Sequence, residues 1–258
     1  MIEQKVLNKP LPHRRAGQGS CVVLVHGYLG GSQQWDSVIA HLADRHDVIA
    51  PDLPGFGDAA DLPGCATIGA MADRVIALLD HLGVVRFILL GHSMGGMIVQ
   101  DMAARLGNRV EKLVLYGTGP LGLMPDRFEP ITQSRDRLAL DGVAHTTRRI
   151  GATWFRKGAD APGFPLVAQI GARANRQAAL SALDAMAAWD GRDKLHSLTM
   201  PTLVVWGHAD QSYRWSQIEA LWQTVPNTTL AVLPGASHAA HLEKPRLFLA
   251  TLDDFLVE

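Results

Sequence analysis

The chain has 258 residues, of which 47% are hydrophobic and 19% are charged, and its formal net charge is −1. This size and composition fit one large α/β domain, or one domain with an insertion, and supply enough apolar side chains for a substantial core. The near-neutral charge gives no global field that would recruit nucleic acid or a membrane surface, and two cysteines, Cys21 and Cys65, are too few for a disulfide framework and indicate a reducing compartment.

The N-terminal half of the chain alternates between expected strands and expected helices. Residues 3–15 are weakly patterned and suit edge strands that prolines interrupt. The N-terminus has no hydrophobic signal core, and no apolar run reaches membrane-spanning length, so we expect a soluble cytoplasmic protein. Short apolar runs, which are typical of strands buried on both faces of a parallel sheet, occur at residues 21–25, 47–50, 87–90 and 110–116.

The alternation stops near the middle of the chain. Residues 121–197 contain amphipathic helical stretches rich in alanine and arginine, without a clear strand. A buried strand is expected again at residues 201–207, followed by a helix, a last strand and a last helix. We therefore expect a core domain made of residues 1–120 and 198–258, with residues 121–197 inserted between its two parts as a helical cap, or lid.

The segment around Ser93 has the sequence of a nucleophile elbow. The apolar run at 87–90 ends in Gly-His-Ser-Met-Gly-Gly at residues 91–96, so a strand, a sharp turn and a helix follow one another. The glycines leave room where the strand and helix backbones pass closely. The helix that starts behind Ser93 directs its free N–H groups and its positive dipole end at the place where negative charge develops. Ser93 is therefore the candidate nucleophile.

A serine nucleophile needs a base within hydrogen-bond reach and an acid that orients this base. In a parallel sheet such groups belong in the loops at the carboxyl ends of the strands. The loop after the strand at 201–207 carries Asp210, and the loop after the last strand carries His238. The chain order Ser93, Asp210, His238 is the order of a triad built on an α/β sheet of this kind.

Five ordered motifs make the chain similar to the α/β-hydrolase-fold serine hydrolases, in the branch of lactonases, small carboxylesterases and carbon–carbon bond hydrolases. The motifs lie at residues 26–28, 52–57, 91–96, 207–210 and 235–238. The resemblance covers about residues 12–120 and 198–257. It implies a mostly parallel, eight-stranded sheet flanked by helices, with the cap inserted after the sixth strand. It also implies Ser93 as nucleophile, Asp210 as acid and His238 as base.

The same resemblance implies an oxyanion hole made of the backbone N–H groups of Tyr28 and Met94. The residues themselves agree with this assignment. Tyr28 follows Gly27 at a strand end, where the chain can bend and turn its amide inward. Met94 is the first helical residue after Ser93, so its N–H has no helical partner. Two such donors in a dry pocket stabilise a tetrahedral oxyanion, and losing one costs roughly 2.7–4 kcal/mol in a comparable site.

Other polar residues near these motifs have simpler explanations. His92 is expected to point sideways into packing, His26 to make a structural hydrogen bond, and His241 to face the core or the pocket wall. His208 fits an ordinary loop, and Asp52 belongs to turn chemistry. Because no group of side chains has metal-ligand spacing and no glycine-rich turn forms a phosphate loop or dinucleotide fingerprint, we expect no metal and no cofactor.

The helical insertion carries the strongest indication about the substrate. Residues 145–176 hold six arginines and lysines against one aspartate. Most of these cations fit a solvated helix face, but an arginine directed into the pocket would bind a substrate carboxylate bidentately. Enol-lactonases and carbon–carbon hydrolases of aromatic degradation, which the chain resembles, place a basic lid residue near a tryptophan. Arg149, Trp154 and Arg176 are the candidates for this role.

We therefore expect a cofactor-free serine hydrolase that cleaves a small, carboxylate-bearing ester or lactone through an acyl-enzyme on Ser93. Its partner would be a small-molecule substrate and neither nucleic acid nor a membrane, and we leave open whether the chain forms a homodimer. The alternatives are carbon–carbon hydrolysis of a vinylogous diketone acid from aromatic ring cleavage, perhydrolysis or lyase chemistry on the same triad, and ligand binding without turnover.

Two departures from the family pattern bear on these alternatives. Carbon–carbon hydrolases usually carry a tryptophan soon after the base, whereas Ala-Ala-His follows His238 at residues 239–241. The loop after Asp210 reads Gln-Ser-Tyr-Arg at residues 211–214, in place of the commoner Val-Pro type. Ser93 itself argues against epoxide hydrolases and dehalogenases, which use an aspartate as nucleophile.

Overall fold

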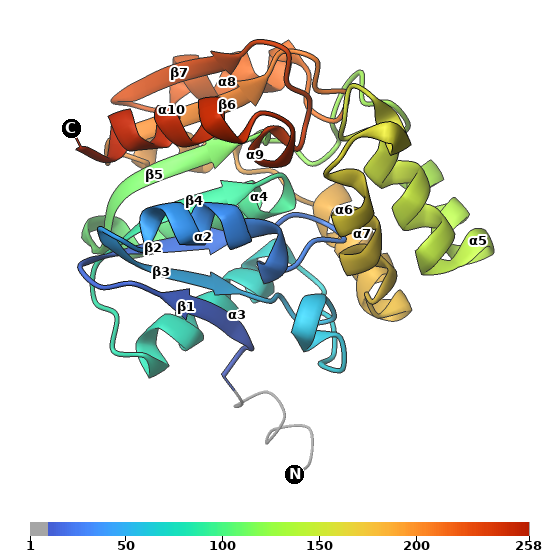
Figure 1. Cartoon of the computed structure of the whole chain (residues 1–258), viewed down its shortest axis with the longest axis horizontal. Coiled ribbons are helices and arrows are strands. Elements are labelled where there is room, and N and C mark those ends of the chain that lie inside the picture. The colour runs from blue at the N-terminus through green and yellow to red at the C-terminus, as the bar shows by residue number, and fades with distance from the viewer. Residues whose placement is uncertain (1–9, 258) are drawn as a thin grey trace.

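The computed structural model describes residues 10–257. Within this range seven strands form one sheet in the order β1-β3-β2-β4-β5-β6-β7 (Figure 1). β1 pairs antiparallel with β3, and all other neighbours are parallel. The strands are β1 (His13–Ala16), β2 (Ser20–Val25), β3 (His46–Pro51), β4 (Phe87–His92), β5 (Val110–Tyr116), β6 (Thr202–Gly207) and β7 (Thr228–Leu233).

Helices cover both faces of the sheet and pack against two separate sets of strand side chains. One face is covered by α2 and α10, and the other by α3, α4 and α8. These helices and the short α9 are α2 (Asp36–Leu42), α3 (Ile68–His81), α4 (Met94–Leu106), α8 (Trp215–Thr224), α9 (Ala240–Glu243) and α10 (Pro245–Val257).

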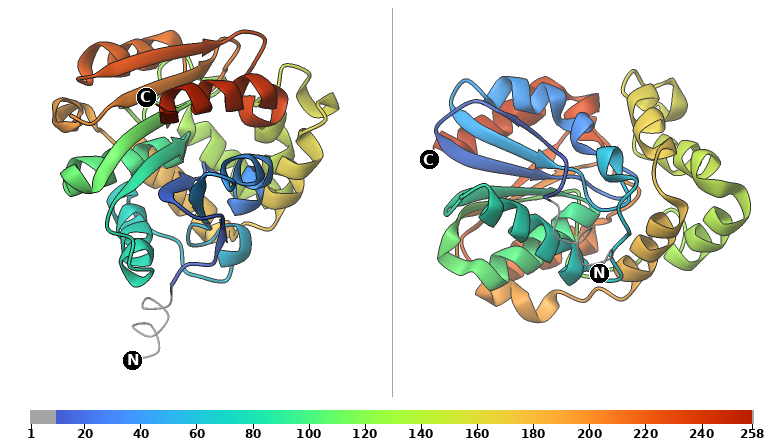
Figure 2. Two further views of the ribbon diagram at one scale, coloured as in Figure 1. Left: turned by 60° about the vertical axis from the view of Figure 1, so that its left-hand side comes forward. Right: turned by 90° about the horizontal axis from the view of Figure 1, so that it is seen from below.

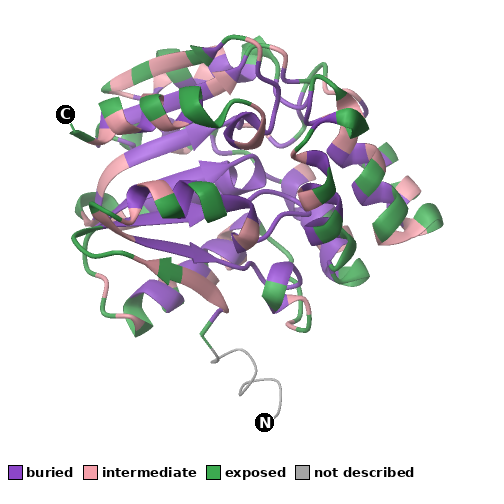
Figure 3. Cartoon of the chain, viewed as in Figure 1, coloured by how far each residue is buried: buried purple, intermediate pink, exposed green. Residues whose placement is uncertain are grey.

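The central strands are buried on both sides because successive side chains point to opposite faces. In β2, Val23 and Val25 pack in the cluster that contains α3 and α4, whereas Val22 and Leu24 pack in the cluster that contains α2 and α10. Every residue of β4 is buried. Figure 3 shows the buried residues concentrated in the central strands and on the inner sides of the helices.

The predicted α/β-hydrolase architecture, with a mostly parallel sheet between helices, is confirmed. Its details differ in two respects, because residues 10–257 contain seven strands instead of the eight expected, and the insertion follows β5, the fifth of them. Before β2 this range holds a single strand, β1, which begins after Pro10 and Pro12 because proline has no N–H to donate to a ladder. The part of the expected edge strands at residues 3–9 lies outside the described residues.

Residues 121–197 form a group of three helices beyond the carboxyl ends of the strands (Figure 1; Figure 2, right). They are α5 (Ile131–Ala152), which is interrupted at Gly142, α6 (Phe164–Ala172) and α7 (Arg176–Ala187). An isolated β-bridge between Leu121 and Asp190 joins the two ends of the insertion. That this segment acts as a cap stays a prediction.

Between residues 10 and 257 the longest and most apolar helices still fall short of what crossing a membrane requires. The described part of the chain also contains no group of three or more His, Cys, Asp or Glu side chains that could hold a metal ion.

Candidate active site

Ser93 lies at the turn between β4 and α4 with a positive φ of 58° and a ψ of −120°. Its N–H donates to the carbonyl of Tyr116 at 2.9 Å, and its carbonyl accepts from Gly96 N at 2.9 Å and from Thr118 Oγ1 at 2.8 Å. These three hydrogen bonds hold a backbone conformation that a serine rarely adopts. The sharp turn predicted for residues 91–96 is therefore present.

Three glycines make this turn sterically possible. A Cβ atom on Gly91 would lie 2.3 Å from the carbonyl oxygen of Gly95, and one on Gly95 would lie 2.4 Å from the carbonyl oxygen of Val25. A Cβ on Gly27 would lie 2.8 Å from the Cβ of Ser93. The loop after β2 therefore runs directly beside the candidate nucleophile.

Asp210 and His238 form a buried hydrogen-bonded pair. The distance from His238 Nδ1 to Asp210 Oδ2 is 2.7 Å, and the two residues are 1% and 0% exposed. The other carboxylate oxygen, Oδ1, accepts the backbone N–H groups of Ser212 at 2.7 Å and Tyr213 at 3.2 Å. A carboxylate held in this way accepts a hydrogen bond from the Nδ1–H of the imidazole, which leaves Nε2 as the nitrogen without a proton.

Ser93 and His238 line the same cavity, so the structure brings the three predicted triad residues together. Side chains at the ends of β4 and β5 make hydrogen bonds to the backbone of His238. His92 Nε2 donates to the carbonyl of His238 at 3.0 Å, and the hydroxyl of Tyr116 lies 3.0 Å from the same oxygen. Burial, reinforced by His238 and His241, keeps the pKa of His92 well below its usual value. As expected, His92 points sideways into packing.

The two amides of the predicted oxyanion hole flank Ser93. Met94 is the first residue of α4, and Tyr28 follows Gly27 in the turn that Gly30 N closes onto Gly27 O at 3.1 Å. Neither N–H has an acceptor within residues 10–257, so both are available to a developing oxyanion. Their role stays a prediction.

The cavity above Ser93 is nearly filled by its own side chains. Its volume is about 10 Å³, close to the smallest volume that holds one water molecule, on the order of 10–15 Å³. The core and the insertion both supply its walls. The lining residues are Tyr28, Ser93, Met124, Arg127, Ile150, Trp154, Met186, Ser212, Tyr213 and His238.

The three residues predicted to bind substrate have different surroundings. Trp154 lines the cavity, with its ring centroid 5.7 Å from that of His238. Arg149 does not line the cavity. Its Nη1 donates to both carboxylate oxygens of Glu129 at 2.8 Å. Arg176 is exposed at the first turn of α7 and donates to the carbonyl of Ala139, so the structure does not bring it to the cavity.

Among the side chains of this cavity that sequence reasoning missed are a cation, Arg127, and a phenol, Tyr213. Arg127 lies in the irregular segment before α5, which has no periodicity from which to predict the direction of a side chain. Tyr213 belongs to the departure from the family pattern at residues 211–214, which was the available signal. Its ring stacks on that of His238 at 5.8 Å between centroids, with 16° between the ring planes.

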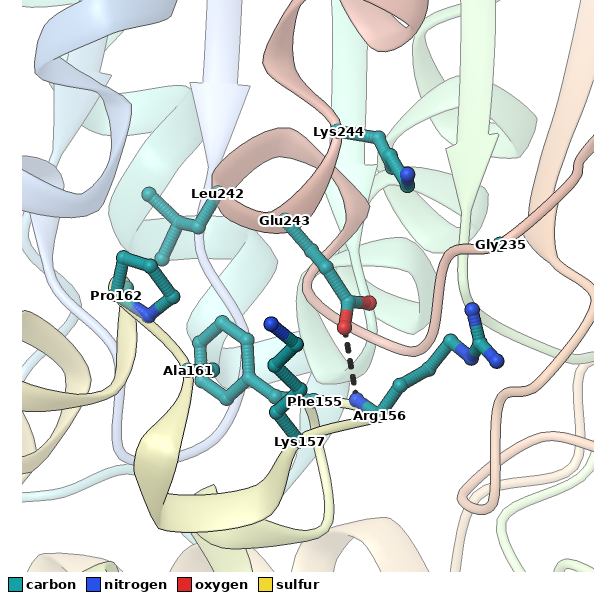
Figure 4. Close-up of a pocket in the computed structure, with 10 residues that line it drawn as sticks. Phe155, Arg156, Lys157, Ala161, Pro162, Gly235, Leu242, Glu243 and Lys244 are labelled. Atoms are coloured by element: carbon teal, nitrogen blue, oxygen red, sulfur yellow. Dashed lines mark hydrogen bonds between the residues drawn. The ribbon is translucent and has the colours of Figure 1, made fainter.

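A second, larger cavity of about 390 Å³ lies between the insertion and α9 and does not include Ser93 (Figure 4). At its edge the carboxylate of Glu243 accepts the backbone N–H of Arg156 at 2.8 Å and that of Ser237 at 2.7 Å. Glu243 therefore connects the insertion to the residue that precedes His238.

Comparison with known proteins gives a family match and several similar chains. A family model described as "Alpha/beta hydrolase family" matches residues 22–251. The chain is 28% identical to a pimeloyl-[acyl-carrier protein] methyl ester esterase of Aeromonas hydrophila, over 94% of this chain and 97% of that protein. It is 27% identical to 3-oxoadipate enol-lactonase 2 of Acinetobacter baylyi, over 83% of this chain and 80% of that protein.

A solved structure is similar over nearly the whole chain. It is a thermophilic esterase from Thermogutta terrifontis with malate bound, at 29% identity and a TM-score of 0.86, and it covers 95% of this chain and 92% of that one.

Proposed function

The chain belongs to the alpha/beta hydrolase family, and from this premise we propose that it is a serine hydrolase that cleaves a small ester or lactone through an acyl-enzyme on Ser93. One observation carries the proposal. The Asp210–His238 pair, hydrogen-bonded at 2.7 Å, meets a serine on a strained strand-to-helix turn in one cavity. A strained turn has a cost in stability that ligand binding alone does not require.

In the proposed reaction Ser93 Oγ attacks the carbonyl carbon while His238 Nε2 takes the hydroxyl proton. The oxyanion accepts hydrogen bonds from the N–H groups of Tyr28 and Met94. His238 then gives the proton to the leaving oxygen, and the C–O bond of the ester or lactone breaks. In deacylation His238 removes a proton from water as the water oxygen adds to the acyl carbon. The bond between the acyl carbon and Ser93 Oγ then breaks while His238 returns the proton to Oγ, and the carboxylic acid product leaves. Asp210 holds the imidazole in one tautomer throughout.

The substrate that we propose is small and carries a carboxylate. A cation, Arg127, lines the cavity that contains Ser93. Similar proteins named as an enol-lactonase and a methyl ester esterase support the bond type. The structure of the similar esterase contains malate, a dicarboxylate, which supports an acid as ligand.

The first experiment measures hydrolysis of p-nitrophenyl acetate and labelling by a fluorophosphonate. We expect the wild-type protein to turn over the ester and to take up the label, and the Ser93→Ala variant to do neither. Thr118→Val, which removes the hydrogen bond to the Ser93 carbonyl and keeps the nucleophile, should still be labelled. Equal labelling of wild type and Ser93→Ala would contradict the assignment of the nucleophile, and a folded wild type without label or turnover would favour ligand binding.

A further inference from the structure

Arg127 lines the cavity above Ser93 and has donors that its protein contacts do not use. Its Nη1 donates to the carbonyl of Glu129 at 2.6 Å and to Ser134 Oγ at 2.9 Å, and its guanidinium lies 4.1 Å from the ring centroid of Phe128. These contacts hold one nitrogen and one face of the group. A guanidinium has five N–H donors, and within the described chain Nε and Nη2 of Arg127 have no acceptor.

The nearest carboxylate does not neutralise Arg127. Glu129 is bound through both oxygens by Arg149 and also by Ser134 Oγ at 2.5 Å, and Arg137 lies 3.5 Å away. Burial opposes the charge of Glu129, but the hydrogen bonds from Arg149 and Ser134 outweigh it and lower the pKa of this carboxyl. No ion pair joins Arg127 to an acid of residues 10–257. A guanidinium stays charged even though burial lowers the pKa of Arg127.

Two tyrosine hydroxyls complete the donor set. Tyr28 and Tyr213 are 4% and 1% exposed, and neither buried hydroxyl makes a hydrogen bond of good geometry within the described residues. Burial raises the pKa of both phenols. For Tyr28 the positive charges of Arg127 and Arg149 oppose this rise, whereas for Tyr213 the neighbouring side chain of Ser93 opposes it most and the charge of Arg127 comes next. A buried hydroxyl without an acceptor is costly to the free protein. An anion between them would satisfy both hydroxyls and the cation.

We infer that Arg127 and the hydroxyls of Tyr28 and Tyr213 form a subsite that binds the carboxylate of the substrate, while the scissile carbonyl faces Ser93. This inference rests on the proposed hydrolase function and identifies the group by which the substrate is selected. Because the residues of the subsite and Ser93 line one cavity, the carboxylate and the ester or lactone carbonyl belong to the same short molecule. The half-ester of a short dicarboxylic acid has this form.

The test compares mono-p-nitrophenyl glutarate with p-nitrophenyl valerate, which has the same chain length without the charge. We expect wild type to prefer the glutarate ester. In Arg127→Gln the ratio of the two kcat/KM values should fall roughly 10- to 100-fold through KM, since charge-assisted hydrogen bonds are lost. Tyr28→Phe and Tyr213→Phe should each lower the ratio by less. Arg135→Gln, which removes an exposed insertion arginine paired with Asp184, is the matched control and should leave it unchanged.

A binding measurement separates this inference from the proposed function. In the Ser93→Ala background glutarate should raise the thermal midpoint, and adding Arg127→Gln should abolish the rise. If Arg127→Gln does not fold, Arg127→Lys replaces it in this measurement. Lysine keeps the charge but lacks the planar pair of donors, so the rise in thermal midpoint with glutarate should be smaller. The subsite would be overturned if Arg127→Gln left the ratio of the two kcat/KM values unchanged and glutarate did not raise the thermal midpoint of Ser93→Ala, even if both esters are hydrolysed. Glutarate binding without hydrolysis of either ester would overturn the proposed function and leave the subsite standing.

Discussion

Two buried histidines support the loop of the proposed base, and both are neutral in the folded protein. His241 packs on Trp35 with 4.7 Å between ring centroids, and its Nδ1 lies 3.0 Å from the hydroxyl of Tyr116. Burial, reinforced by His238, lowers the pKa of His241 to about 3. The same causes act on His92. Protonating either ring would place an uncompensated charge inside the protein.

This predicts a loss of stability in acid. An unfolded histidine has a pKa of about 6.5 and binds a proton below it, whereas folded His241 stays neutral down to a pH of about 3. Its contribution is therefore complete above pH 6.5 and is lost as the pH falls towards 3. At pH 5 His241 should lower the free energy of unfolding by about 2 kcal/mol relative to pH 7.

Urea unfolding of wild type and His241→Asn at pH 7 and pH 5 measures this effect, because the asparagine keeps a hydrogen-bonding group beside the Tyr116 hydroxyl and does not titrate. The free energy of unfolding of the variant should change less between the two pH values than that of wild type. If it changes equally in both proteins, His241 does not cause the loss of stability.

At the level of elements, the contact of β2 and β4 with the start of α4 decides the position of Ser93. The carbonyl oxygens of Val25 and His26 lie 2.4 and 2.6 Å from the place where a Cβ of Gly95 would stand. Both obstacles are backbone atoms of a buried strand end, so they cannot move aside as a flexible side chain would.

Gly95→Ala should therefore lower the free energy of unfolding by about 2 kcal/mol or more, since forcing extra atoms into a packed core costs about 1–3 kcal/mol. Gly69→Ala in α3 is the matched control, because a Cβ at Gly69 would have its nearest neighbour, Asp101 Oδ2, at 3.8 Å. That variant should gain about 0.5–1 kcal/mol from helix propensity. Urea unfolding measures both, and a Gly95→Ala protein as stable as wild type would contradict the packing argument.

At the scale of the whole molecule, the insertion is tied to the core around a cavity of about 10 Å³. Asn175 N donates to Gly55 O at 2.8 Å, and Arg173 forms an ion pair with Asp58 at 2.9 Å. A p-nitrophenyl ester is far larger than one water molecule, so we predict that the insertion moves away from the core when such a substrate enters.

Linking the insertion to the core should therefore inhibit entry. Asp58 and Arg173 are both exposed, so Asp58→Cys/Arg173→Cys in a Cys65→Ser background accepts a cleavable bis-maleimide, while Cys21 is buried. We expect kcat/KM to fall at least 10-fold on cross-linking and to recover on cleavage of the linker. Labelling the same cysteines with N-ethylmaleimide should have little effect. Unchanged activity of the cross-linked protein would rule out this movement.

The features that the sequence predicted are those encoded by neighbouring residues. The elbow follows from an apolar run that passes into closely spaced glycines, because the turn imposes its steric demand on adjacent positions. Asp210 and His238 follow from their places after the last two strands, because parallel strands end at one edge of the sheet. The insertion is recognisable as the stretch where the strand pattern stops. Each inference uses short-range patterns together with a general rule of sheet topology.

By itself, therefore, the sequence determined the architecture, the elbow and the identity of the three proposed triad residues. Only the tertiary structure decided which arginine faces the cavity. Arg127, Arg149 and Arg176 are alike in sequence, but the packing of the insertion on the core directs the first into the cavity, pairs the second with Glu129 and leaves the third exposed. The physical reason is that the direction of a long side chain depends on contacts between segments that are distant in the sequence. The local periodicity of the sequence contains no information about those contacts.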